Sequence, residues 1–177
     1  MKVEKTKLDG VLVITPETFE DERGFFLESF NKDRYRKAGI KFDFVQDNHS
    51  CSTKGVLRGL HYQILKPQGK LVRVVKGEVF DVAVDIRKGS KTYGQWEAIV
   101  LSEKNKTQFW VPPGFAHGFV VLSETADFEY KCTDYYDSSD EGSLLWNDPD
   151  LGIHWPIKNP ILSEKDSNAP RLIDLKL

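Results

Sequence analysis

Val79-Phe-Asp-Val-Ala-Val-Asp-Ile-Arg87 is the stretch of sequence that decides the fold. Apolar side chains occupy every even position from Phe80 to Ile86, and mainly polar side chains occupy the odd positions. A period of two is typical of a β-strand, because successive side chains of a strand point to opposite faces of the sheet. We therefore expect a strand with one face in a hydrophobic core.

Similar short runs recur along the chain, and turn residues such as Lys76-Gly77, Tyr93-Gly94 and Pro112-Pro113-Gly114 separate most of them. Many short strands with few helical stretches between them favour an antiparallel sandwich or barrel over βαβ units, with the jelly roll as the leading candidate. The predicted strands lie at 10–15, 24–30, 44–52, 56–64, 70–76, 79–87, 96–102, 107–112, 118–123 and 126–133.

One helix is expected in the first half of the chain, over Asn31–Ala38, with Asn31 as its N-cap and Gly39 just past its end. The region 137–177 is richer in Pro, Asp, Ser and Asn, so we expect loops and short helical turns laid over the barrel. A chain of 177 residues is long enough for one hydrophobic core, and we expect a single domain, 1–177.

The composition predicts a globular protein in a reducing, cytoplasmic setting. The net charge of −2 gives no general attraction to nucleic acid, and no segment is long and apolar enough for a signal peptide or a membrane span. Cys51 and Cys132 lie far apart without the C-x-x-C spacing of a zinc or redox pair.

The spacing of residues resembles the two motifs of the metal-binding cupins. The first motif matches 55–63 followed by 67–77, and the second matches Pro112-x-Gly114-x-x-His117. The metal-ligand positions of those proteins match His61, Gln63, Lys70 and His117 here. A divalent cation requires neutral imidazoles or anionic ligands, so an amide and an ammonium group make a poor metal site. We therefore expect no metal. The simpler alternative is that both histidines are satisfied interior side chains.

The same residue types suit proton transfer without a metal. An imidazole acts as a general base near neutral pH and contributes roughly 10² to 10⁴ in rate, while a buried ammonium group stabilises an oxyanion as it forms. Together they can produce an enolate beside a ketone. A tyrosine can then return a proton from the opposite face, because its unperturbed pKa is high.

An ordered series of motifs from residue 21 to residue 166 is similar to the dTDP-4-dehydrorhamnose 3,5-epimerase family. The matching blocks are Asp21-Glu-Arg-Gly-Phe-Phe-Leu-Glu-Ser-Phe30, Gln46-Asp-Asn-His-Ser50, 55–63, Pro113-Gly-Phe-Ala-His-Gly-Phe119, Tyr130-Lys-Cys-Thr-Asp-Tyr-Tyr136 and Leu162-Ser-Glu-Lys-Asp166. The ordered set is far more specific than any one block. The resemblance implies a cupin-like jelly-roll barrel, all-β and antiparallel, with a few short helices.

The resemblance also implies catalytic roles. The base falls on His61, the acidic residue that orients it on Asp166, the proton donor on Tyr130 and the support for the C4 oxyanion on Lys70. Two alternatives stay open. Asp166 could be a helix cap in a Ser163-x-x-Asp166 capping box, and Tyr130 could be an ordinary packed aromatic residue.

For the nucleotide, the resemblance implies that Tyr136 stacks on the thymine. The other substrate-binding positions are Arg23, Phe26, Glu28, Gln46, Asp47, Asn48, Arg58, Lys70, His117, Glu141 and Lys165. Arginine suits phosphate oxygens, and an aromatic ring offers a face to a base. Taken singly, 21–24 could be a charged turn, and Glu141 and Lys165 a solvated surface pair.

The activity implied is inversion at C3 and C5 of dTDP-4-dehydro-6-deoxy-D-glucose, giving the L-rhamnose precursor without a cofactor. Family members are homodimers whose N-terminal segments cross to the neighbouring subunit, so we expect a homodimer. Three alternatives stay open: an epimerase that inverts only C3 or only C5, a metal-dependent cupin isomerase or oxygenase, and a non-catalytic sugar-binding cupin.

Overall fold

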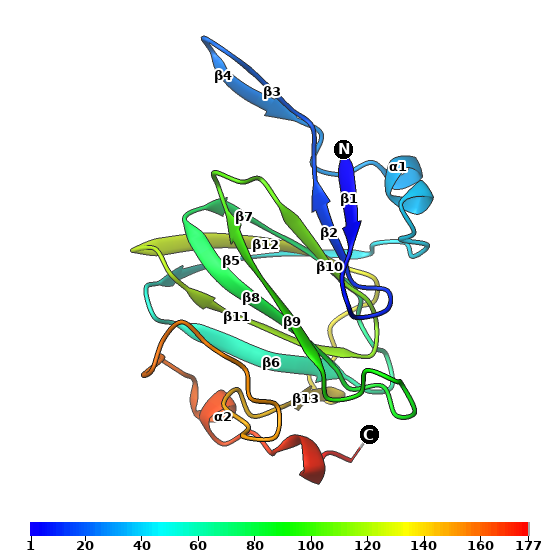
Figure 1. The fold of residues 1–177 in the computed structure, drawn as a ribbon, viewed down its shortest axis with the longest axis vertical. Coiled ribbons are helices and arrows are strands. Elements are labelled where there is room, and N and C mark those ends of the chain that lie inside the picture. Colours follow the sequence, from blue (N-terminus) through cyan, green and yellow to red (C-terminus); the bar gives the residue numbers. More distant parts are fainter. Residues whose placement is uncertain (177) are drawn as a thin grey trace.

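The computed structural model describes residues 1–176, which form two facing antiparallel β-sheets and a projecting hairpin (Figure 1). The six-stranded sheet has the order β1 (Lys2–Lys5), β2 (Leu12–Thr15), β10 (Gln108–Val111), β7 (Lys70–Lys76), β12 (Thr125–Cys132) and β5 (Gln46–Thr53). The five-stranded sheet has the order β13 (Glu141–Ser143), β6 (Leu57–Gln63), β11 (Phe115–Val121), β8 (Glu78–Asp85) and β9 (Trp96–Ser102). The hairpin pairs β3 (Thr18–Asp21) with β4 (Gly24–Leu27).

This architecture confirms the predicted all-β, antiparallel, cupin-like barrel, and each predicted run overlaps a strand. Three strands were not predicted: β1, β3 and β13. The sequence of β1 is Lys-Val-Glu-Lys on a sheet edge and that of β13 is Glu-Gly-Ser, so neither shows an alternating apolar pattern. Strand β11 also begins earlier than expected, at Phe115 instead of residue 118.

The helices are short, as expected. Helix α1 (Lys32–Lys37) starts after Asn31, whose side chain accepts a 3.2 Å hydrogen bond from the backbone N–H of Arg34. Helix α2 (Glu164–Ser167) and the 3-10 helix η1 (Leu172–Asp174) belong to the C-terminal segment, which lies against the five-stranded sheet (Figure 1). None of the helices within 1–176 has both the length and the apolar character needed to cross a membrane.

The expectation that β8 buries a single face is wrong, because both of its faces are buried. Val79 and Ala83 belong to the core between the two sheets, where Phe109 and Phe128 also pack. On the other face, the apolar even positions form a second core with residues of the C-terminal segment; this core includes Val82, Val84, Ile86, Leu144 and Leu151. The more polar face of the strand therefore points into the barrel, and the C-terminal segment covers the apolar one.

Strands β6 and β11 approach each other closely at two glycines. A Cβ atom on Gly118 would lie 2.6 Å from the Arg58 carbonyl oxygen and 3.0 Å from Gly59 Cα. Directly along the ladder from this contact, His61 and His117 are register partners. The close approach of the two backbones therefore helps to bring both imidazoles to the same place.

Gly118→Ala should lower the free energy of unfolding by about 1–3 kcal/mol, because overpacking forces backbone shifts of that cost. Urea denaturation of the two proteins measures the difference. An unchanged unfolding free energy would mean that β6 and β11 can separate without cost, contrary to the packing described.

Candidate functional site

A cavity of about 470 Å³ lies between the two sheets and is closed on one side by the C-terminal segment. We call it the inner cavity. Both sheets contribute to it, through β5, β7 and β12 on one side and β6 and β11 on the other. Its titratable lining residues are Arg58, His61, Lys70, His117, Tyr130, Lys165 and Asp166.

His61 and Asp166 form a hydrogen-bonded pair within this cavity, with 2.6 Å between His61 Nε2 and Asp166 Oδ1. Asp166 is 3% exposed. Burial by itself would raise the pKa of the Asp166 carboxyl, but the hydrogen bond and charge of His61 outweigh burial and lower that pKa. The carboxylate stays ionised and fixes the orientation of the ring.

The capping alternative is correct only in part: Ser163 caps the helix, but the Asp166 carboxylate bonds His61 and the Gly59 N–H and does not complete a capping box. The Ser163 side chain accepts a 3.1 Å hydrogen bond from the Asp166 backbone N–H, which caps α2. The cap uses the backbone of Asp166 and leaves its carboxylate for His61, so one residue serves both purposes.

A second imidazole–carboxylate pair lies in the same region. His117 Nε2 is 2.8 Å from Asp81 Oδ1, and both side chains are buried. Asp81 Oδ2 has no hydrogen-bond partner among residues 1–176. Burial raises the pKa of the Asp81 carboxyl, and the charge of His117 opposes this only in part. The sequence analysis missed Asp81; the available signal was a carboxylate inside the apolar run 79–87.

Lys70 and Tyr130 reach the inner cavity from the six-stranded sheet, whereas His61 comes from the five-stranded sheet. Burial lowers the pKa of the Lys70 ammonium, and Cys132 and Glu141 oppose this shift. Burial also raises the pKa of Tyr130 to about 12, so its phenol is protonated at neutral pH. An imidazole and a protonated phenol therefore occupy opposite walls of one cavity.

An adjoining cavity of about 270 Å³ shares His61, Lys70 and Tyr130 with the inner cavity. Its other lining residues are Gln46, Asn48, Tyr62, Gln63, Gln68, Tyr136 and Glu141. Most of the predicted nucleotide-binding residues thus gather beside the predicted catalytic residues. His61, Lys70 and Tyr130 therefore lie at the boundary between the cavities, where one ligand could extend from one cavity into the other.

Glu141 joins the adjoining cavity to helix α2. Its carboxylate accepts a 2.9 Å hydrogen bond from the Tyr136 hydroxyl and forms an ion pair with Lys165. The pair expected as a surface alternative is therefore present, and it lies at the site. On the inner-cavity side, Arg58 Nε donates a 3.0 Å hydrogen bond to Ser52 Oγ, which holds the guanidinium group in place.

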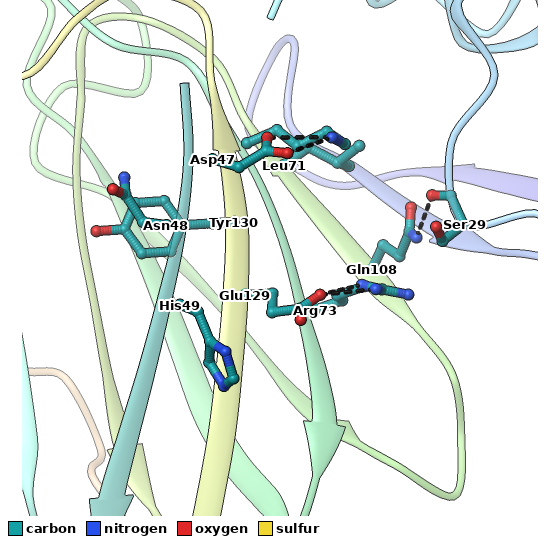
Figure 2. A pocket seen from close by; sticks show the side chains of 10 residues that line it. Ser29, Asp47, Asn48, His49, Leu71, Arg73, Gln108, Glu129 and Tyr130 are labelled. Atoms are coloured by element: carbon teal, nitrogen blue, oxygen red, sulfur yellow. Dashed lines mark hydrogen bonds and ion pairs between the residues drawn. The ribbon is translucent and has the colours of Figure 1, made fainter. Parts of the chain in front are cut away.

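Four predicted site residues lie away from both cavities. Asp47 points to the outer face of the six-stranded sheet, where it pairs with Lys131 near the Arg73–Glu129 ion pair (Figure 2). The other three lie on or beside the projecting hairpin, and they are Arg23, Phe26 and Glu28.

The hairpin residues are largely exposed. The Arg23 side chain is 86% exposed and pairs with Asp21, as in the charged turn considered from the sequence, and Phe26 is 70% exposed. Glu28 is bonded to Asn31 and Arg34. No contact within residues 1–176 brings these side chains to His61.

Within the described residues, no group of three or more His, Cys, Asp and Glu side chains is arranged to hold a metal ion. Of the cupin ligand positions, His61 and His117 each have a ring nitrogen bonded to a carboxylate, and Lys70 stands where those proteins have a carboxylate. This donor set does not suit a divalent metal.

Comparisons with known proteins agree on one family. The model of the family described as dTDP-4-dehydrorhamnose 3,5-epimerase matches residues 5–174. A Shigella flexneri protein of that name is 57% identical over 177 residues, covering 98% of this chain and 97% of the relative.

Two solved structures extend the comparison. The Legionella pneumophila dTDP-6-deoxy-D-glucose-3,5-epimerase, in complex with dTDP-4-keto-L-rhamnose, has a TM-score of 0.96 and 56% identity over 98% of this chain and 94% of that one. A 3'-monoepimerase from Streptomyces bikiniensis, in complex with dTDP-quinovose, has a TM-score of 0.89 and 36% identity over 95% and 86%.

Asp166→Asn and Asp81→Asn should change the pH dependence of stability in opposite directions. The lowered pKa of Asp166 stabilises the folded state above the unfolded-state value of about 3.9, and this contribution is lost as the pH falls through the folded pKa. Asp166→Asn should therefore lose stability relative to the parent as pH rises. Asp81 has a raised pKa, so the parent loses stability above about pH 3.9 and Asp81→Asn should gain relative to it.

Urea denaturation across the acidic to neutral range measures both differences. Differences that move in the same direction with pH for the two variants would contradict the electrostatic description of the two pairs.

Proposed function

The chain belongs to the dTDP-4-dehydrorhamnose 3,5-epimerase family, and from this premise we propose that it converts dTDP-4-dehydro-6-deoxy-D-glucose into dTDP-4-dehydro-L-rhamnose. It is an isomerase that inverts C3 and C5 of the sugar. The observation that carries the proposal is the opposition of His61 and Tyr130 across the inner cavity, because inversion requires a base on one face of the sugar and an acid on the other.

In the proposed mechanism, His61 removes the proton from C3 and, in a second cycle, from C5. The electron pair of the broken C–H bond forms a double bond to C4, and the π electrons of the C4 carbonyl move to its oxygen. The product is an enolate whose negative charge lies on the C4 oxygen. Asp166 keeps the imidazole oriented and stabilises the imidazolium that forms, since it accepts a hydrogen bond from the ring. Tyr130 then protonates the carbon from the opposite face. Before the second cycle, the His61 imidazolium loses its proton to solvent and the Tyr130 phenolate regains one from solvent.

Lys70 is proposed to stabilise the enolate oxygen. Its pKa is lowered by burial, which means that its positive charge is poorly solvated in the free protein. A negative charge that develops at C4 interacts with this ammonium group more strongly than the neutral ketone does. The stabilisation is therefore larger in the transition state than in the ground state, as catalysis requires.

No cofactor is needed in this scheme, because each proton removed is replaced and the sugar undergoes no net oxidation. The nucleotide is proposed to occupy the adjoining cavity, with Tyr136 against the thymine. Two cations of the inner cavity, Arg58 and Lys165, suit the diphosphate.

An enzyme that inverts only one centre is the alternative. Identity to the 3'-monoepimerase is 36%, against 57% to the Shigella 3,5-epimerase, which favours inversion at both carbons. Product analysis by NMR distinguishes the two activities.

We also propose a homodimer of one-domain chains, in the cytoplasm. Two-stranded hairpins have little stability alone, and this hairpin exposes three aromatic side chains, Phe19, Phe25 and Phe26. A partner subunit would cover them and would receive Arg23 and Phe26 at its own active site. Cys51 and Cys132 are both unpaired, which suits a reducing compartment.

In D₂O, the protein should catalyse deuterium incorporation at C3 and C5 of the 4-keto sugar nucleotide, followed by NMR. His61→Asn should reduce the exchange rate by about 10² or more, because it removes the base. His154→Asn is the matched control, since His154 lies outside both cavities. Absence of exchange with the parent protein, or full exchange with His61→Asn, would overturn the proposed mechanism.

The crossing of the hairpin can be tested with mixed dimers of Arg23→Ala and His61→Asn chains. If Arg23 acts in the partner's site, each mixed dimer contains one intact site, and activity should return when two weakly active proteins are dissociated and reassociated together. If Arg23 acts in its own chain, every site carries a defect. Turnover that stays at the level of the separate variants would then contradict the crossed arrangement.

A further inference from the structure

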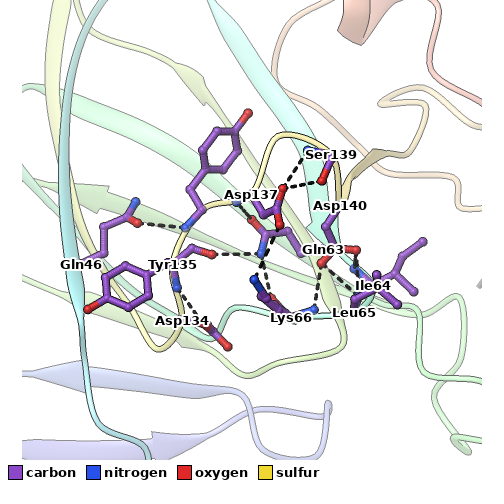
Figure 3. A network of polar contacts seen from close by, with 11 residues as sticks. Gln46, Gln63, Ile64, Leu65, Lys66, Asp134, Tyr135, Asp137, Ser139 and Asp140 are labelled. Atoms are coloured by element: carbon purple, nitrogen blue, oxygen red, sulfur yellow. Dashed lines mark hydrogen bonds and ion pairs between the residues drawn. The ribbon is translucent and has the colours of Figure 1, made fainter.

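Gln63 occupies a position that the metal-binding cupins use for a ligand, and the proposed mechanism gives it no role. The side chain is 6% exposed at the end of β6. Its Nε2 donates to the carbonyl oxygens of Lys66 (2.8 Å) and Tyr135 (3.3 Å), and its Oε1 accepts a 3.0 Å hydrogen bond from the Asp137 N–H (Figure 3). Both donors and the acceptor of the amide are therefore engaged with loop backbone.

Gln46 binds the same loop from the other sheet. Its Oε1 accepts a 2.9 Å hydrogen bond from the Tyr136 N–H, and its Nε2 donates to Asn48 Oδ1 at 3.1 Å. Gln46 belongs to β5 of the six-stranded sheet, and Gln63 belongs to β6 of the five-stranded sheet. Two amides thus attach the backbone of 135–137 to both walls of the adjoining cavity (Figure 3).

The carboxylate of Asp140 fixes the neighbouring loop, 64–66. Asp140 accepts hydrogen bonds of 2.8–3.1 Å from the backbone N–H groups of Ile64, Leu65 and Lys66. This fixes the Lys66 carbonyl that Gln63 uses. The two loops, 64–66 and 134–140, are consequently joined through Gln63 and Asp140.

Little besides this backbone attachment positions the Tyr136 ring. The residue is 52% exposed, and its hydroxyl donates to Glu141. Among the described residues it makes none of the close ring–ring contacts that the other aromatic clusters show. A ring held mainly by its own backbone depends on whatever fixes that backbone.

We propose that Gln63 is a positioning residue for nucleotide binding, whose amide holds the backbone on both sides of Tyr136 and so presents its ring to the base. This inference rests on the proposed function of the adjoining cavity. It assigns Gln63 to nucleotide affinity and gives it no part in proton transfer.

The test compares dTDP binding by calorimetry with turnover at saturating substrate. Gln63→Glu keeps the length of the side chain but replaces the donor with an anion that faces two carbonyl oxygens. The fraction of protein with a correctly placed ring should fall, so Kd for dTDP and KM should rise about tenfold or more. The value of kcat should stay within about twofold, because the transition-state contacts are unchanged.

A double-mutant cycle separates positioning from direct contact. In a Tyr136→Ala background, Gln63→Glu should change the dTDP Kd by less than about twofold, because its effect acts through the missing ring. Effects that add in full would show that Gln63 acts independently of Tyr136 and would overturn the inference. Equal dTDP affinities of Gln63→Glu and the parent would overturn it as well.

Ser139→Ala is the matched control, since it removes a hydroxyl bonded to Asp137 in the same loop without touching either glutamine. Its dTDP Kd should equal that of the parent. If Gln63→Glu fails to fold, Gln63→Met, which removes the same hydrogen bonds without adding charge, takes its place in every measurement. Failure of the parent to bind dTDP would defeat the proposed function itself, an outcome distinct from a parent that binds and a variant that binds equally well.

Discussion

The hydrogen bond between Asp166 and His61 connects the C-terminal segment to the barrel, and the site depends on it. A four-residue helix such as α2 has no stability of its own, so tertiary contacts must place it. Backbone hydrogen bonds from Ile161 to Gly55 and from Leu57 to Ile161 bring the chain back beside β6, two residues before the Ser163 cap. Docking of the segment therefore closes the inner cavity and orients the imidazole in one event.

Charge in the cavity is balanced unevenly, and the imbalance favours chemistry that creates an anion. Lys165 is neutralised by Glu141, and Arg58 is held by a neutral hydroxyl. Lys70 forms no ion pair within 4 Å with any carboxylate of residues 1–176, although its side chain is half-buried and desolvation lowers its pKa. The desolvation of its ammonium group is thus relieved most fully when negative charge appears beside it. A chain with net charge −2 can therefore bind an anionic nucleotide through local charge alone.

Local signals in the sequence predicted the strands with clear alternation and the Asn31 cap, whereas the family resemblance predicted most of the residues that meet in the two cavities. The contacts between residues far apart in the sequence were harder to predict. The period of β8 correctly indicated a strand, but a period of two cannot tell which face meets the opposite sheet and which meets the C-terminal segment. Asp81 was missed for the same reason, since its role follows from contact with a histidine on a neighbouring strand. The motif containing Arg23 was recognisable, yet its position relative to His61 depends on chain packing that no local pattern encodes.

A metal ion fixes its ligands by coordination, and a site that lacks suitable ligands must fix its side chains by other means. Here several side chains are fixed by hydrogen bonds on the side away from the cavity. Carboxylates bind one nitrogen of each histidine, a hydroxyl holds Arg58, and backbone groups of two loops engage both the nitrogen and the oxygen of the Gln63 amide. Such contacts leave the other ring nitrogen of each histidine available to a ligand, whereas coordination would occupy it. Replacing the ion with hydrogen-bond partners therefore converts groups that would be consumed in binding a metal into groups that can exchange protons.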